Sequence, residues 1–278
     1  HFMLGKAFDG NGDATFEEFK TNRVIIAERL RKQAGLPDTD TGFGENSQQV
    51  LIPAFLATYS GRDASKVKLS AFRDIPIPNW RLTYKGFMKF KWFKKHFRSF
   101  IVEHQYNSTY SVIGFNNNLL YNEANKFTEL DDNQYYRSER IFSGVNLIEE
   151  FNPLIKVDMR MKNSFSVRAE LKQDKALNLN VSNNTITEIR GKEYVLGLGY
   201  RLKDVKLKIR TGNTLTSFKG DINFTGDVSI RNNSTTIRSI DVLNNQVTGG
   251  QRLLSASFFI WNSNRRDHKW LANHQCGC

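Results

Sequence analysis

The sequence predicts a mainly β fold of antiparallel strands, with short helices near the N-terminal end. Apolar and polar residues alternate from Leu154 to Lys172, and Asn163 is the only exception on the apolar parity. Successive strand side chains point to opposite faces, so this segment has one apolar and one ionic face. Soluble strands usually have about 5–6 residues, and barrel strands need about 9–11 per membrane crossing. The length is typical of a transmembrane barrel wall, and a half-buried soluble sheet stays open as the alternative.

The charge balance of the chain is strongly basic. Its 278 residues include 40 Lys+Arg against 28 Asp+Glu, a formal charge of +12, and its mean hydropathy is -0.50. Such a charge first suggests nucleic acid as a partner. Much of it, however, alternates along the expected strands, and it is not gathered in one patch. The sequence contains neither a signal-peptide pattern nor the run of about 18 apolar residues that a spanning helix needs.

The first third of the chain has a helical pattern. Thr15 followed by Glu18 fits a capping box, and apolar residues then recur at helical spacing. We expect a helix from Phe16 to Lys32 that stops before Gly35.

A second, apolar helix is expected at Val50 to Tyr59. Pro53 should start or break it, and Gly61 should end it. The two prolines of Ile75–Pro78 predict an extended connector, because they suit neither a helix nor a central strand.

Strands dominate the remainder, with a polar loop at 121–140. Further strands are expected at 97–115, 176–181, 194–202 and 222–230. The apolar parity changes from even to odd around Lys203–Asp204, which predicts a two-residue hairpin tip there. No such change occurs around Asn163, so that stretch is either one long strand or a hairpin with an odd-length loop.

The densest basic run, Lys85–Arg98, interleaves lysines with aromatic residues. Such a run could stack on single-stranded nucleic acid. It equally resembles an interfacial segment, in which rings and cations lie at the level of lipid headgroups. We favour the interfacial segment or a solvated turn over nucleic acid.

Candidate ligand residues fit known sites poorly. Asp9–Asp13 imitates the start of an EF-hand loop, but Ala14 stands where glycine is needed and Lys20 where the bidentate glutamate belongs. A polar turn before the helix is the preferred interpretation. The terminal cluster matches no usual zinc spacing, and we expect it to lie in a disordered tail. Its members are His268, His274, Cys276 and Cys278.

No catalytic motif is recognisable in the chain. His96 and His104 are isolated, and we expect packed or interfacial side chains rather than bases. Gly197 and Gly199 lie inside a strand pattern rather than in a dinucleotide loop. We therefore expect a protein that is not an enzyme, with no catalytic, cofactor-binding or metal-binding residues.

Five phrases of the sequence resemble one family in that family's own order. They are Asn46–Arg62 (NSQQVLIPAFLATYSGR), Ile77–Met88 (IPNWRLTYKGFM), Phe97–Leu120 (FRSFIVEHQYNSTYSVIGFNNNLL), Asn183–Val205 (NNTITEIRGKEYVLGLGYRLKDV) and Asn232–Val242 (NNSTTIRSIDV). They are similar to the C-terminal part of the SprA/Sov translocon, the outer-membrane pore of the type 9 secretion system in Bacteroidota. The resemblance covers roughly Asp9 to Arg252.

The resemblance implies a segment of a very large barrel in the bacterial outer membrane. It implies export of folded cargo with C-terminal sorting domains, and of adhesins in gliding bacteria. The implied partners are this cargo, accessory outer-membrane and plug proteins of the system, and lipid or lipopolysaccharide, but no nucleic acid. Another barrel, such as a porin or a TonB-dependent receptor, is the alternative, and a soluble β-rich binding module is the third.

The expected organisation has three parts. Residues 1–80 form helices and loops in or beside the barrel, residues 81–260 form strands of its wall, and residues 261–278 form an atypical tail. The family continues with further strands, whereas the segment from Ser255 onward has neither alternation nor a strand ending. Because the chain also begins at His1, we expect a piece of a longer protein with a truncated or frame-shifted end.

Overall fold

The computed structural model describes residues 12–72, 78–211, 214–240 and 246–262. In these ranges the protein is mainly β, and seven strands form one antiparallel sheet in which each strand pairs with its neighbours in sequence. The long strands far exceed the usual length of about 5–6 residues. The strands are β1 (Trp80–Tyr84), β2 (Phe97–Asn117), β3 (Arg140–Met161), β4 (Phe165–Asn180), β5 (Thr185–Thr211), β6 (Thr214–Ser239) and β7 (Gln246–Asn262).

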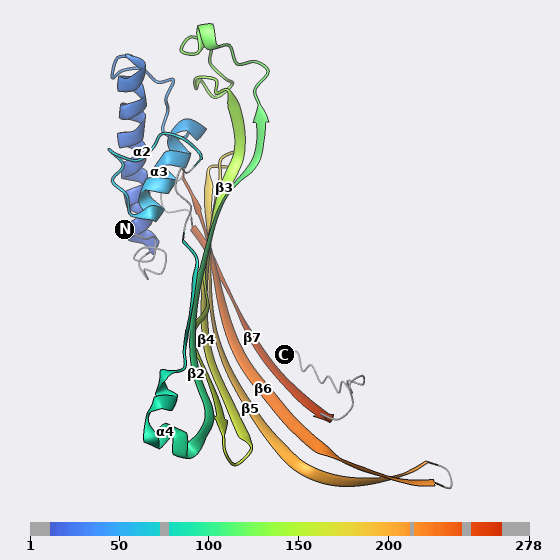
Figure 1. Cartoon of the computed structure of the whole chain (residues 1–278). Helices are drawn as coiled ribbons and strands as arrows, with labels where there is room; N and C mark the ends of the chain where they lie inside the picture. The colour runs from blue at the N-terminus through green and yellow to red at the C-terminus, as the bar shows by residue number, and fades with distance from the viewer. Residues whose placement is uncertain (1–11, 73–77, 212–213, 241–245, 263–278) are drawn as a thin grey trace.

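The helices lie at two ends of the sheet (Figure 1). One end is covered by α2 and α3, and the other end carries α4 beside the start of β2. The helical elements are α2 (Gly12–Ala34), α3 (Gln48–Ser60), η1 (Gly86–Lys89), α4 (Lys91–His96) and η2 (Glu123–Asn125). We call α2, α3 and residues 61–72 the helical layer.

The first expected helix is confirmed, but its start is not. Helix α2 begins at Gly12, so Thr15 lies within the helix and the predicted capping box is wrong. Asp13 stands in the first turn instead, where a carboxylate favours the positive end of the helix dipole. The helix ends before Gly35, which has a φ of +69°.

Helix α3 confirms the second expected helix and its end at Gly61, whose φ is +63°. The expected start or break at Pro53 is wrong, because the helix runs from Gln48 through Pro53 to Ser60. Every residue from Val50 to Ser60 is buried. This packing offsets the backbone hydrogen bond that proline removes. Of the predicted connector, residues 75–77 lie outside the described residues.

The strand predictions hold within longer strands. The segments 97–115, 194–202 and 222–230 fall inside β2, β5 and β6, and 176–181 falls at the end of β4, which stops at Asn180. The loop predicted at 121–140 is confirmed up to residue 139 and contains η2, and Arg140 begins β3. At Asn163 the hairpin with an odd-length loop is confirmed, since three residues join Met161 to Phe165.

The predicted hairpin tip at Lys203–Asp204 is wrong. Strand β5 continues through these residues, and its register with β6 shifts between Leu202 and Val205. Leu202 pairs with Ile222 and Val205 with Gly220, so two residues of β5 face Asp221 alone. Because of this β-bulge, the apolar residues of β5 change from even to odd numbers while they stay on one face. A two-residue turn would produce the same change in the sequence.

Asp221 holds the bulge together. It accepts hydrogen bonds from the backbone N–H of Asp204, at 2.9 Å, and from Nε of Arg201, at 2.8 Å. Asp204 adopts a positive φ of 55°, which Asp tolerates better than most residues.

A second irregularity lies in β3 and leaves the parity unchanged. Phe151 pairs with Gln173 and Ile155 with Leu171, so residues 152–154 face residue 172 alone. Two extra residues preserve the alternation on both sides of the bulge. Pro153 suits this place because it has no N–H for the ladder.

The expected loss of strand structure after Ser255 is wrong for its first part, because β7 reaches Asn262. Ala256 pairs with Val228 and Phe258 with Gly226, so apolar side chains continue on one face. Phe259 and Trp261 fall on the other parity and hide this alternation in the sequence.

The core lies between the helical layer and the covered end of the sheet. Buried side chains of α2 and α3 pack against the strands there. The strand residues of this core are Val145, Leu147, Leu177, Leu179 and Ile186, and Ile240 joins them directly after the end of β6.

A buried ionic cluster extends this core. Glu188 forms ion pairs with Lys175 at 3.0 Å, Arg190 at 2.5 Å and Arg238 at 2.9 Å. The side chains of Lys175 and Glu188 are only 3% and 4% exposed. Arg238 also pairs with Asp13 of α2 at 3.1 Å, so the cluster ties the helical layer to the sheet.

Removing Glu188 should therefore be costly. We expect Glu188→Ala to lower the free energy of unfolding by about 3–5 kcal/mol, because buried cations lose their carboxylate. The measurement is urea unfolding of the full chain.

Glu103→Ala is the matched control. Its pair with Lys156, at 3.1 Å, is more exposed and should be worth less than about 1 kcal/mol. Equal losses for the two variants would contradict the structural role of the buried cluster.

Candidate functional site: a sheet with two unlike faces

The register assigns each strand residue to one of two faces. In each strand, every second residue lies on the polar face. This face carries an ionic ladder across β2 to β6. The ladder contains Glu103, Lys156, Asp158, Arg168, Glu170, Lys172, Glu193, Arg231 and Asp174. Cross-strand neighbours alternate in sign, so each charge lies beside an opposite one.

Arg231 shows how tightly the ladder is joined. It contacts Asp174 of β4 at 2.7 Å and Glu193 of β5 at 3.4 Å, while lying itself on β6. Glu193 in turn lies 3.8 Å from Lys172. Three strands are therefore linked through their side chains as well as through their backbones.

The polar face is hollowed at one end of this ladder. A hollow of about 620 Å³ lies over β2 to β6, and its charged side chains include Asp158 and Arg168 of the ladder together with Arg160, Arg201 and Asp227. Gly197 makes room in it, because a Cβ at that position would lie 2.2 Å from Oδ1 of Asp227. Such a surface favours contact with water or with polar chains.

The opposite face carries an exposed apolar band. Leu198 is 57% exposed and Phe258 54% exposed, values unusual for strand residues of a folded sheet. Exposed members of the apolar band are Leu82, Tyr84, Ile155, Phe165, Tyr194, Leu196, Leu198, Tyr200, Leu202, Val228, Ile230, Leu254 and Phe258.

The band has a sharp border toward the helical layer. On β5 it runs from Tyr194 to Leu202, nine residues, close to the 9–11 of a barrel crossing. Toward the helical layer it stops at a row of polar residues paired across four strands: Gln173, Lys192, Asn232 and Arg252.

Near its other end the band is crossed by an aromatic row, one pair before Leu202 and Ile222, and we call this row the aromatic border. Phe165 pairs with Tyr200, which pairs with Phe224, and the rings of Phe165 and Tyr200 lie 4.6 Å apart. Aromatic residues at both margins of an apolar band are typical of membrane interfaces.

Residues 85–98 lie near this aromatic border, and we call them the basic-aromatic platform. They connect β1 to β2 through η1 and α4. Phe93 packs on Phe100 at 4.9 Å and on Phe87 at 5.3 Å. This packing fixes α4 against the start of β2. The sequence had predicted either an interfacial segment or a solvated turn here.

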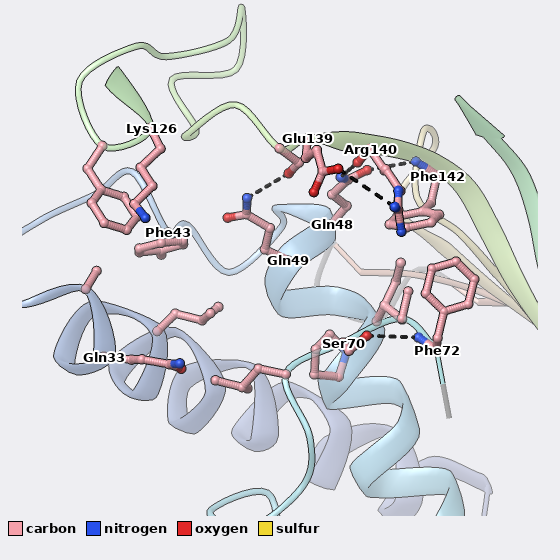
Figure 2. A pocket seen from close by; sticks show the side chains of 18 residues that line it. Gln33, Phe43, Gln48, Gln49, Ser70, Phe72, Lys126, Glu139, Arg140 and Phe142 are labelled. Atoms are coloured by element: carbon pink, nitrogen blue, oxygen red, sulfur yellow. Dashed lines mark hydrogen bonds and ion pairs between the residues drawn. The ribbon is translucent and has the colours of Figure 1, made fainter. Parts of the chain in front are cut away.

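A second cavity, of about 560 Å³, lies between the helical layer and the start of β3 (Figure 2). Two glutamines of α3 bridge it. Gln48 donates to the carbonyl of Arg140 at 2.5 Å and accepts from the N–H of Phe142 at 3.0 Å. Gln49 donates to Oγ of Ser138 at 2.7 Å.

The candidate residues of the sequence lie apart from one another. Nδ1 of His96 lies 2.9 Å from the carbonyl of Trp92, and Nδ1 of His104 lies 2.6 Å from that of Leu154. His104 is half-buried and packed, as expected, whereas His96 is exposed. Gly197 and Gly199 lie within β5, also as expected. Residues 9–11 of the imitated EF-hand and the four terminal histidines and cysteines lie outside the described residues.

Within the described ranges, no three His, Cys, Asp or Glu residues are placed to hold a metal ion. In those ranges, too, no helix has the length and apolar character required to cross a membrane.

The sequence alone missed three features: the pairing within the ionic ladder, the buried Glu188 cluster and the glutamine bridges of α3. The alternation of charges signalled a polar face, but the partner of each charge depends on strand register. Comparison of the chain with protein-family models and with curated proteins found no match.

The ladder should contribute modestly to stability. In a double-mutant cycle of Arg231→Ala and Asp174→Ala, we expect a coupling free energy of about 0.2–1 kcal/mol, because both side chains are part-exposed. It should decrease when salt is raised from about 0.1 M to about 1 M. A coupling that does not respond to salt would show that these charges do not interact as placed.

Proposed function

We propose that the protein forms part of the wall of a transmembrane β-barrel in a bacterial outer membrane. The observation that carries this proposal is the exposed apolar band, bordered by polar and aromatic rows and backed by a charged, hollowed face. Lipid on one side and water on the other would satisfy both faces. In water alone, a contiguous apolar surface of this kind would need a partner.

We further propose that this wall belongs to a protein-conducting channel of the type 9 secretion system. This proposal rests on the five phrases that resemble the SprA/Sov translocon. The channel would not be an enzyme. It would export folded cargo with C-terminal sorting domains, and accessory outer-membrane and plug proteins of the system would be its partners. A porin or a TonB-dependent receptor is the competing barrel, and the length of the parent protein would distinguish it.

Adjacent residues of β4 test the membrane assignment. Val167 belongs to the apolar side and pairs with Leu198, whereas Ser166 belongs to the polar face and pairs with Gly199. Lipid on the apolar side predicts that Val167→Lys lowers the free energy of unfolding in vesicles by about 2–4 kcal/mol, because the charge would face hydrocarbon.

Ser166→Lys is the matched control at almost the same depth, and we expect a change within about 0.5 kcal/mol. The measurement is reversible urea unfolding in phosphatidylcholine vesicles. Equal tolerance of lysine at both positions would remove the membrane assignment and leave a soluble β-rich module.

The channel assignment is tested in the full-length parent protein. Deleting Val50–Gly61 should reduce cargo at the cell surface and increase periplasmic cargo. Because the whole of this segment is buried, the deletion can also lower translocon abundance, which must be measured alongside.

A milder variant separates these effects. Gln48→Ala with Gln49→Ala removes the hydrogen bonds to the start of β3 and to Ser138 just before it. The apolar core of α3 stays intact, so we expect export to fall with little change in abundance. Gln33→Ala, in the same cavity, is the control and should export normally. Normal surface cargo and normal abundance in the double variant would leave the bridges without a role in transport.

A further inference from the structure

The basic-aromatic platform differs from the rest of the charged surface. Residues 85–98 contain six Lys and Arg and no Asp or Glu. Of the ion pairs formed among the described residues, none involves these six cations, whereas the cations of the ionic ladder are paired. A compact set of unpaired cations favours an anionic partner that is external to the chain.

The platform also exposes apolar rings between its charges. Phe90 is 59% exposed and Trp92 60% exposed. Trp92 lies with its ring 4.8 Å from that of His96 and 5.9 Å from that of Phe97, so it is held at the surface rather than drawn into the core. Exposed rings among cations suit a partner that is both apolar and anionic.

The geometry of α4 gathers three of the cations. Lys91, Lys94 and Lys95 stand at positions i, i+3 and i+4 and therefore share one side of the helix. All three are exposed. Packing of Phe93 against Phe100 fixes this helix, so the backbone positions of the lysines are set before a partner arrives.

The position of the platform beside the apolar band indicates which anionic partner it binds. It follows Tyr84, an exposed residue of the apolar band, and it lies near the aromatic border of that band. In a barrel wall, that level is the level of lipid headgroups. We propose that the basic-aromatic platform binds the phosphate-bearing headgroups of anionic lipids, with Lys91, Lys94 and Lys95 as the phosphate-binding residues. This inference rests on the proposed membrane function and adds a lipid preference to it.

Relative lipid binding tests the proposal. The full chain, with Trp80, Trp261 and Trp270 changed to Phe, is folded into vesicles that mix phosphatidylglycerol and phosphatidylcholine. One lipid at a time is brominated, so that quenching of Trp92 fluorescence reports which lipid occupies the platform. We expect phosphatidylglycerol to be strongly preferred, and K91Q/K94Q/K95Q to lower that preference by up to about 100-fold, since each charge contributes about fivefold.

The matched control is K32Q/K66Q/K126Q, which removes three exposed lysines at the helical end and should keep the preference. An equal affinity for both lipids, or an unchanged preference in K91Q/K94Q/K95Q, would overturn the proposal. So would a single-stranded oligonucleotide that binds the platform and is not displaced by phosphatidylglycerol vesicles.

The experiments distinguish a failure of the proposed membrane function from a failure of the proposed lipid preference. If neither brominated lipid quenches Trp92 while Ser166→Lys and Val167→Lys are tolerated equally, the membrane function itself is wrong. If both lipids quench Trp92 equally, the chain enters the bilayer and only the lipid preference is wrong.

Discussion

The register of the antiparallel sheet is the constraint on which both faces depend. Because side chains alternate strictly, a slip of one residue in any strand would place its charges among the apolar side chains. The register is continuous between some long partners, as between β4 and β5, where pairs run from Phe165 to Asn180 of β4. One extra residue at the β5 bulge exchanges the parities, and two extra residues in β3 do not. The apolar band and the ionic ladder therefore share one cause.

The apolar side of the sheet is covered in one part and exposed in the other. Near the helical layer it is buried under α2 and α3, and beyond the row of Lys192, Asn232 and Arg252 it is bare. Under the proposed assignment the bare part faces lipid, so the helical layer stands on the outer side of the wall. It would then lie beside the barrel rather than inside it, and it would brace the wall through Glu188 rather than plug the lumen.

Local patterns predicted the elements whose causes are local. Gly61 ends α3 through its own backbone conformation, and the alternation around Asn163 required an odd-length loop. The bulge at Lys203–Asp204 could not be predicted in this way, because a tight turn and a bulge change parity alike. What decides between them is Asp221, 17 residues away in sequence, which holds the N–H of Asp204. Thr15 likewise had the chemistry of a cap, but the helix begins earlier, where Asp13 reaches Arg238.

The distribution of charge explains why a formal charge of +12 need not indicate nucleic acid. Cations of the ionic ladder lie opposite carboxylates, so the ladder adds little net field and its members mainly order the wall. The platform contains six Lys and Arg and no Asp or Glu. It therefore contributes a disproportionate part of the attraction for anions. A surface that is uniformly basic would track a polyanion along its whole length. A short basic segment at the edge of an apolar band meets a lipid headgroup and an acyl chain at the same time, which a nucleic acid cannot supply.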